Sequence, residues 1–152
     1  MAKILIVEDN ALNIKLFCDL LAAHGHEPEA VTDSRNALDA AHQFSPDLVI
    51  TDIQLPHVSG LELIRMIRDD EQLSAIPIMA VTAYSTTEDE ERIRGAGAQA
   101  YVSKPISVMR FAQTVEDLLK DHGSHDLIAQ VDVQANESED SPGPGETGGE
   151  ES

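Results

Sequence analysis

The segment Leu48-Val49-Ile50-Thr51-Asp52 decides the fold, because it is a short apolar run that ends in a carboxylate. Three similar runs end in other polar groups: Glu8 and Asp9 follow the first, Thr82 ends the next, and Lys104 follows the last. If these runs are parallel strands, their carboxyl ends meet at one edge of one sheet. Carboxylates, a hydroxyl and an ammonium gathered there suit one divalent cation and one phosphoryl group.

The apolar pattern along the chain alternates between two kinds. Short runs rich in Ile and Val are typical of strands buried on both faces, and segments with helical spacing lie between them. The predicted strands are Lys3–Val7, Glu27–Val31, Leu48–Asp52, Ile78–Thr82 and Ala100–Ser103. Five strands alternating with five helices predict an α/β fold, a doubly wound (βα)5 flavodoxin-like sandwich with a parallel sheet of order 2-1-3-4-5.

Four of the predicted helices have a clear apolar face. Gly25 ends the first, the second runs from a cap at Asp33 or Ser34 to Phe44, and the third covers about Gly60 to Asp70. The residues predicted to face the sheet from the first, third and fifth helices are Leu16, Phe17, Leu20, Leu21, Leu61, Ile64, Ile67, Val108, Phe111, Ala112, Val115, Leu118 and Leu119. The fourth helix, near Thr87–Gly95, has few apolar residues and an acidic first turn, so we expect it to be exposed and loosely held.

The chain has 152 residues, which suits one folded domain and a tail. We assign residues 1–120 to the domain and residues 121–152 to the tail. The tail holds nine acidic residues and no Lys or Arg, and from Asn136 onward it has no apolar residue that could pack. Such a segment cannot bury enough surface to offset the entropy of ordering, so we predict that it is disordered.

The formal net charge of −18 argues against nucleic acid or an anionic membrane as a partner, because both require a basic patch. No apolar stretch approaches the roughly 20 residues of a membrane-spanning helix, and the residues before the first strand are too few for a signal peptide. The single cysteine, Cys18, cannot form an intrachain disulfide and is expected to be an inert thiol. We therefore expect a cytoplasmic protein without membrane insertion.

The predicted site has the groups that phosphoryl transfer to a carboxylate requires. Asp52 is the expected nucleophile, and a cation must offset the charge of the oxygens that approach it. Mg²⁺ or Mn²⁺ would be bound by the carboxylates of Asp9 and Asp52, by the backbone carbonyl of Gln54 and, through water, by Glu8. Thr82 and Lys104 can bind the remaining phosphoryl oxygens.

These motifs resemble the receiver domain of two-component response regulators. The resemblance covers residues 3–120 and lies in Glu8-Asp9-Asn10, Asp52 with Pro56 and Gly60, Val81-Thr82-Ala83 and Ser103-Lys104-Pro105. It implies that Asp52 accepts a phosphoryl group from a phosphohistidine of a sensor histidine kinase or a phosphotransfer protein. It also implies the roles of metal acids for Glu8 and Asp9, switch hydroxyl for Thr82, phosphate contact for Lys104 and aromatic switch for Tyr101, and a cis bond between Lys104 and Pro105.

The resemblance extends to the output. The chain also resembles single-domain members of the family that act in cell-cycle and polarity signalling, and the resemblance implies that a downstream protein binds the face of helix 4, strand 5 and helix 5. Because the tail does not suit a DNA-binding domain, the predicted output is a protein–protein interaction. We also hypothesise that Tyr84, two residues after Thr82, shields the phosphoryl group from hydrolysis.

Other functions remain open from the residues alone. A hydrolase that forms an aspartyl phosphate usually has a second Asp two residues after its nucleophile, whereas this chain has Gln54. A flavin or nucleotide binder of the same fold would need a Gly-rich phosphate loop after the first strand, and none follows Val7. A phosphate-independent pseudoreceiver that acts as an adaptor is a further alternative. We predict that the protein is not an enzyme beyond its own phosphorylation and dephosphorylation.

Overall fold

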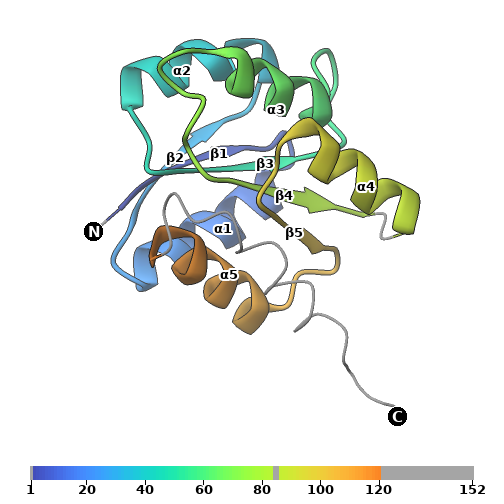
Figure 1. The fold of residues 1–152 in the computed structure, drawn as a ribbon. Coiled ribbons are helices and arrows are strands. Elements are labelled where there is room, and N and C mark those ends of the chain that lie inside the picture. Colours follow the sequence, from blue (N-terminus) through green and yellow to red (C-terminus); the bar gives the residue numbers. More distant parts are fainter. Residues whose placement is uncertain (1, 84–85, 121–152) are drawn as a thin grey trace.

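The predicted α/β fold is confirmed by the structure, a computed structural model that describes residues 2–83 and 86–120. All strand pairs are parallel and the sheet order is β2-β1-β3-β4-β5 (Figure 1). The strands have the predicted bounds. In chain order the elements are β1 (Lys3–Val7), α1 (Ala11–Ala23), β2 (Glu27–Val31), η1 (Ser34–Asn36), α2 (Ala37–Phe44), β3 (Leu48–Asp52), α3 (Gly60–Asp69), β4 (Ile78–Thr82), α4 (Thr87–Ala96), β5 (Ala100–Ser103) and α5 (Val108–Lys120).

The sheet lies between two helical layers, with α2, α3 and α4 on one face and α1 and α5 on the other (Figure 1). Alternate residues of a strand point to opposite faces, so Leu5 packs in the core under α2, α3 and α4 while Ile4 packs in the core under α1 and α5. In the second core the rings of Phe17 and Phe111 stack with centroids 5.0 Å apart, which joins α1 to α5.

The predicted start of the second helix and the predicted burial of the second strand need correction. Asp33 caps a 3-10 turn, η1, and the α-helix begins only at Ala37, because the Asp33 side chain accepts the backbone N–H of Arg35 and tightens the first turn. Strand β2 is not buried on both faces, since it is an edge strand and only Val31 in it is buried.

The predicted inward faces of α3 and α5 were also partly wrong. In α3 the buried side chains are Leu63, Ile64 and Ile67, whereas Leu61 is only partly buried because it lies in the first turn, at the rim of the sheet. In α5, Val108 is 48% exposed because it begins the helix beyond the sheet edge, and Thr114 occupies a buried position instead. A hydrogen bond from Thr114 Oγ1 to the Arg110 carbonyl lets this hydroxyl lie in the core.

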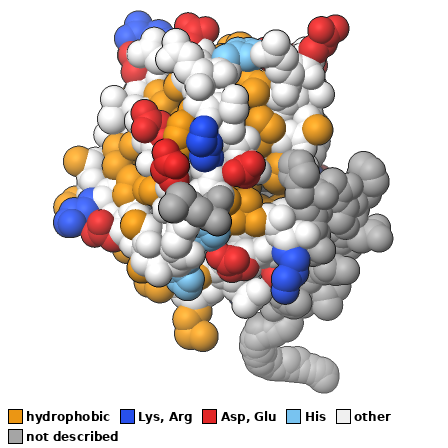
Figure 2. Space-filling view, turned by 90° about the vertical axis from the view of Figure 1, so that its left-hand side faces the viewer, with side chains coloured by type: hydrophobic (Ala, Val, Ile, Leu, Met, Phe, Trp, Pro, Cys, Tyr) orange, Lys and Arg blue, Asp and Glu red, His pale blue; other side chains and the backbone are white. Residues whose placement is uncertain are grey.

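Helix α4 has the expected acidic first turn and few buried residues. Thr86 caps the helix, three acidic residues occupy its first turn, and its buried residues are Ile93 and Ala96. Among the described residues, no helix combines the length and the apolar character needed to cross a membrane. Figure 2 looks onto the side where β1 begins, and there the basic side chains are separated from one another by acidic, polar and apolar ones.

Candidate functional site

The strand register brings the predicted polar groups to one edge of the sheet. Asp52 pairs with Val81 across β3 and β4, and Thr82 pairs with Ser103 across β4 and β5, so these strands end at the same level. The residue after β1, Glu8, is buried at the same edge, as are Asp52 and Thr82. Buried carboxylates cost free energy unless they are paired or hydrogen-bonded, so apolar packing does not explain why Glu8 and Asp52 are buried at this edge.

Asp52 is held by donors on both carboxylate oxygens. Its Oδ2 accepts a hydrogen bond from Lys104 Nζ at 2.7 Å, and its Oδ1 accepts the backbone N–H of Gln54 at 2.9 Å. The Asp52 side chain is 3% exposed and the Lys104 side chain 26% exposed. A charge-assisted hydrogen bond at a largely buried carboxylate is strong and directional, so it fixes where the carboxylate oxygens point.

The second carboxyl group at this edge, that of Glu8, has unusual surroundings. Its Oε2 accepts the backbone N–H of Asn10 at 3.1 Å, but its Oε1 is buried and has no hydrogen-bond donor among the described residues. Burial, together with the nearby charge of Asp52, raises the pKa of Glu8 to about 7. A buried carboxylate oxygen that lacks a donor fits a cation or a cation-bound water, so Glu8 suits the predicted role beside a metal ion.

The third predicted acid, Asp9, has a side chain exposed to solvent. Among residues 2–83 and 86–120, no three histidine, cysteine or acidic side chains lie close enough together to hold a metal ion by themselves. Like charges repel, so bringing a third carboxylate beside Glu8 and Asp52 costs free energy that a bound cation would offset. The structure therefore brings Glu8 and Asp52 together with Lys104, and leaves Asp9 at the rim.

Thr82 lines a cavity of about 250 Å³ at the loop that follows Asp52. Its walls come from the loop after Asp52, from the first turn of α3, from Thr82 and from one side of α4, and they are Ile53, Gln54, Leu61, Thr82, Asp89, Arg92 and Ile93. The Lys104 backbone N–H donates to the Thr82 carbonyl at 2.7 Å, and the bond between Lys104 and Pro105 is cis, as the resemblance implied. The sequence did not indicate the ion pair of Arg92 with Asp89 at this cavity.

Tyr101 is half-buried and is tied to α4. Its hydroxyl donates to Glu90 Oε1 at 3.0 Å, and Glu90 also forms an ion pair with Arg94. Burial and the neighbouring Glu90 carboxylate raise the pKa of the Tyr101 hydroxyl. The predicted aromatic switch residue therefore connects β5 to the weakly packed helix. Tyr84 lies outside the described residues.

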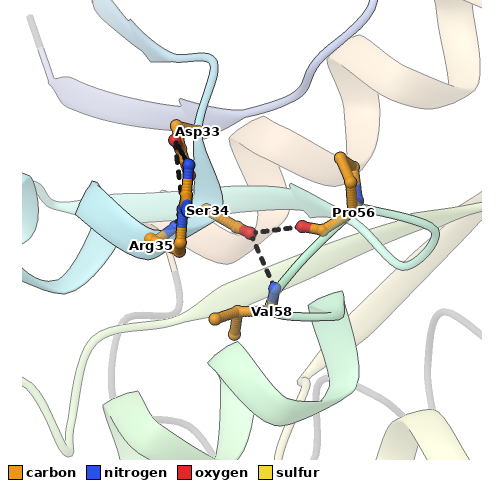
Figure 3. A network of polar contacts seen from close by, with 5 residues as sticks. All are labelled: Asp33, Ser34, Arg35, Pro56 and Val58. Carbon is orange, nitrogen blue, oxygen red and sulfur yellow. Dashed lines mark hydrogen bonds and ion pairs between the residues drawn. The ribbon is translucent and has the colours of Figure 1, made fainter.

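Two residues that position the loop after Asp52 were missed as such in the sequence. A side chain at Gly60 would place its Cβ 2.1 Å from the Asp52 carbonyl oxygen, so only glycine allows α3 to begin against the backbone of Asp52. Ser34, considered only as a helix cap, donates from Oγ to the Pro56 carbonyl and accepts the backbone N–H of Val58 (Figure 3). The role of neither residue could be read from one sequence, since the partners of both are backbone atoms.

This geometry agrees with comparisons to known proteins. Residues 4–116 match the model of the response regulator receiver domain. The chain belongs to this family. It is 52% identical over 118 residues to the polar-differentiation response regulators DivK of Brucella ovis and Brucella anthropi, an overlap of 78% of this chain and 96% of each relative.

Solved structures show the same fold. The chemotaxis response regulator CheY4 of Vibrio cholerae has a TM-score of 0.73 and 28% identity, over 76% of this chain and 97% of CheY4. A putative response regulator from Chloroflexus aurantiacus has a TM-score of 0.75 and 25% identity, over 78% of this chain and 98% of its own. The family match, the DivK relatives and the CheY-like fold together make the chain a receiver-domain response regulator of two-component signalling.

Proposed function

We propose that Asp52 is the phosphoacceptor of this response regulator and that a sensor histidine kinase or a histidine phosphotransfer protein is its donor. The observation that carries the proposal is the 2.7 Å contact between Lys104 Nζ and the Oδ2 atom of buried Asp52. A cation aimed at a buried carboxylate supplies the charge that a phosphoryl group on that carboxylate would need.

The reaction follows from this arrangement. An Asp52 carboxylate oxygen attacks the phosphorus of the phosphohistidine, the phosphorus–nitrogen bond breaks, and the imidazole leaves with its electron pair. Lys104 moves its hydrogen bond to a phosphoryl oxygen as negative charge builds there, and the Thr82 hydroxyl donates to another. Burial of Asp52 excludes water from the acyl phosphate that results.

We assign the metal site to this chain's own oxygen donors. Asp9, Asp52 and the Gln54 carbonyl would hold Mg²⁺ or Mn²⁺, and the orphan Oε1 of Glu8 would accept from a metal-bound water. When bound, the cation offsets the repulsion between the carboxylate and the incoming phosphoryl oxygens. This assignment explains why Glu8 is buried at the acceptor although it has no counter-charge of its own beyond Lys104.

The output is a change of shape at the face of α4, β5 and α5. Phosphorylation adds nearly two negative charges at Asp52 and draws Thr82 toward them. Space next to Thr82 then allows Tyr101 to turn inward and to leave Glu90, which alters the face that a downstream protein binds. By its similarity to DivK, we propose a role in cell-cycle and polarity signalling in the cytoplasm, with no nucleic acid as a target.

A mass measurement tests the acceptor. The protein is incubated with Mg²⁺ and acetyl phosphate, and its intact mass is compared with those of Asp52→Ala and of a sample with chelator. We expect a base-labile gain of one phosphoryl group in the first sample only. A gain that persists in Asp52→Ala would show that another residue is the acceptor. No gain with acetyl phosphate or with a phosphorylated histidine donor would favour the pseudoreceiver.

The switch has its own test. Tyr101→Ala should accept the phosphoryl group normally but should lose the phosphorylation-dependent changes in amide chemical shift along α4 and α5. Tyr101→Phe is the matched control, because it keeps the ring and removes only the hydroxyl. Equal shift changes in Tyr101→Ala and in the unaltered protein would contradict a role for the ring.

A further inference from the structure

The loop between Asp52 and Gly60 carries the backbone groups that act on the acceptor. Its first residues provide the Gln54 N–H, which donates to Asp52 Oδ1 at 2.9 Å, and the Gln54 carbonyl, the proposed third metal ligand. The base of the loop is closed by the Gly60 N–H, which donates to the Ile53 carbonyl at 2.9 Å. The position of the Gln54 carbonyl therefore depends on what holds the rest of the loop.

The far end of this loop has a backbone conformation that its sequence does not favour. His57 has a φ of 72°, in the left-handed region, which costs a non-glycine residue about 1 kcal/mol or more. Such a residue keeps this conformation only when its surroundings hold it in place. The neighbours of His57 on both sides, Pro56 and Val58, are the two residues bound by Ser34.

The hydroxyl of Ser34 forms hydrogen bonds to the residues on both sides of His57. Its Oγ donates to the Pro56 carbonyl at 3.0 Å and accepts the Val58 N–H at 3.2 Å, as the close-up in Figure 3 shows. The Ser34 side chain is 4% exposed, so water has little access to these groups. Loss of the hydroxyl would leave a carbonyl and an N–H in this part-buried position without their partner.

Ser34 is itself fixed by the turn on which it lies. Asp33 accepts the Arg35 backbone N–H at 2.9 Å and the Arg35 side chain at 2.8 Å, and these bonds form the start of η1 (Figure 3). The hydrogen bonds from Arg35 lower the pKa of Asp33 to about 2, so this clasp persists at any physiological pH. The turn after β2 thus presents Ser34 to the loop after β3.

We propose that Ser34 is a positioning residue for the metal-dependent phosphorylation of Asp52, because it holds the loop that presents the Gln54 carbonyl. This proposal rests on the proposed function. Ser34 touches neither the phosphoryl group nor the cation; it acts by keeping the loop in the one conformation in which Gln54 faces the acceptor. Groups that hydrogen-bond directly to metal ligands typically change metal affinity by about 10- to 100-fold when they are removed. Ser34 acts from further along the loop, so we expect its effect at the lower end of this range.

The test compares Ser34→Ala with Thr114→Ala. Thr114 is the matched control, because its hydroxyl is also 4% exposed and hydrogen-bonded but lies on α5, on the other face of the sheet. The unphosphorylated proteins are titrated with MgCl₂, and binding is followed by NMR at the amides of Asp52, Ile53 and Gln54. About 0.1 M KCl screens weak binding of Mg²⁺ to exposed acidic groups.

We expect Ser34→Ala to bind Mg²⁺ about 10-fold more weakly than the unaltered protein, and Thr114→Ala to bind it equally well. Ser34→Thr keeps the hydroxyl and should restore most of the affinity. Hydrogen exchange at the Val58 amide should be faster in Ser34→Ala only. The rate of phosphorylation by acetyl phosphate at saturating Mg²⁺ should recover toward that of the unaltered protein.

The outcomes separate the two proposals. If the unaltered protein shows no Mg²⁺-dependent shifts at these amides and no phosphorylation of Asp52, the proposed function fails. If it shows both and Ser34→Ala has the same Mg²⁺ affinity, Ser34 does not position the site. An equal loss of affinity in Ser34→Ala and Thr114→Ala would mean that general destabilisation is the cause, which also overturns the inference.

Discussion

Helices α3 and α4 cover the same face of the sheet and begin in equivalent ways, yet they are held very differently. Each follows a strand that ends in a site residue, and each has a hydroxyl cap, Ser59 for α3 and Thr86 for α4. Ser59 forms a full capping box with Glu62, and α3 buries Leu63, Ile64 and Ile67. Helix α4 buries only one large apolar side chain, Ile93, and its first turn is acidic.

The α3 side and the α4 side of the candidate site therefore suit different roles. The α3 side carries Asp52 and its loop, where a misplaced oxygen would impair the proposed metal binding and the proposed attack by Asp52, so tight packing is useful there. The α4 side carries the Tyr101–Glu90 contact. Segments with few buried apolar contacts open at lower free energy, so α4 is the better candidate for an element that phosphorylation displaces.

The largest effect is expected from a pair of glycine substitutions that contrast the two helices. Gly60→Ala places a Cβ 2.1 Å from the Asp52 carbonyl oxygen, so the backbone must shift. We expect a loss of about 3 kcal/mol in the free energy of unfolding and little phosphorylation of Asp52. Gly95→Ala in α4 meets no atom within 4 Å and should stabilise the protein by about 0.5 kcal/mol. Urea unfolding measures both.

Either of two results would contradict this contrast between α3 and α4. If Gly60→Ala were tolerated with full phosphorylation, α3 would not be fixed against the acceptor. If Gly95→Ala were destabilising, α4 would be packed on its exposed side by something more than the described contacts.

The next largest effect concerns Arg68, which joins the two helices. It lies on α3, and its guanidinium donates to the Gly97 carbonyl at the end of α4, to the Ser74 and Ile76 carbonyls, and to Gln99 Oε1. Burial lowers the pKa of Arg68 from its ordinary value, but the group stays charged. We expect Arg68→Ala to cost about 2 kcal/mol in urea unfolding, since several acceptors of a charged donor lose their partner.

Arg68→Lys is the informative control for this prediction. A single ammonium cannot reach acceptors in so many directions as the planar guanidinium does, so Lys should recover little of the loss. Full recovery by Lys would mean that only the positive charge near the end of α4 matters. That result would weaken the view that Arg68 ties α4 in place through its geometry.

The sequence predicted the strands better than the helix faces. Strands β1, β3, β4 and β5 are short runs rich in apolar residues, and a polar residue ends or follows each of them, a local signal that leaves little freedom in their bounds. Strand β2, Glu27–Val31, lacks such a run, and its predicted burial was wrong. The predicted inward face of α3 left out Leu63, which is buried, and included Leu61, which packs against the core but is only partly buried. Apolar residues at both positions fit a helical period, and the sheet decides which is covered. Val108 was wrong for a related reason, since its helix begins beyond the sheet edge.

The site was predictable where one residue type carries one kind of chemistry. Asp52, Thr82 and Lys104 stand at strand ends, and a parallel sheet brings such ends together. The contacts of Ser34 were not predictable, because its partners are backbone atoms 22 and 24 residues away, which leave no mark in the pattern of side chains. The contact of Tyr101 with Glu90 also depends on how α4 lies on β5, which periodicity does not specify.

A smaller effect sharpens the difference between the helices at Tyr101. Tyr101→Phe removes the hydroxyl that donates to Glu90 Oε1 and should cost about 1 kcal/mol or less in global stability. Hydrogen exchange should become faster at amides of α4 and stay the same at amides of α3, because only α4 loses a tie to β5. Faster exchange in both helices, or in neither, would show that this hydrogen bond does not set the local stability of α4.

The smallest effect is a pH dependence at the C-terminal end of α3. There Asp70 accepts from His42 of α2 at 2.7 Å, and His42 also contacts Gln72. The hydrogen bond with Asp70 raises the pKa of His42 from its ordinary value of 6.5. For Asp70, burial acts to raise the pKa, but the bonds with His42 and two backbone N–H groups outweigh it and lower the pKa from 3.8.

These shifts set the pH window in which the contact stabilises the fold. A raised histidine pKa gives stability that is fully present below pH 6.5 and is lost as the pH rises through the folded-state value. A lowered aspartate pKa gives stability that is present above pH 3.8 and is lost as the pH falls through the folded-state value. His42→Gln should therefore lower the free energy of unfolding most between pH 4 and pH 6. The deficit should shrink as the pH rises past 7. A deficit that is independent of pH would mean that the His42 ring stabilises the end of α3 by packing alone. The stability of α3 would then come from its apolar contacts and its cap, with no contribution from the charge of His42.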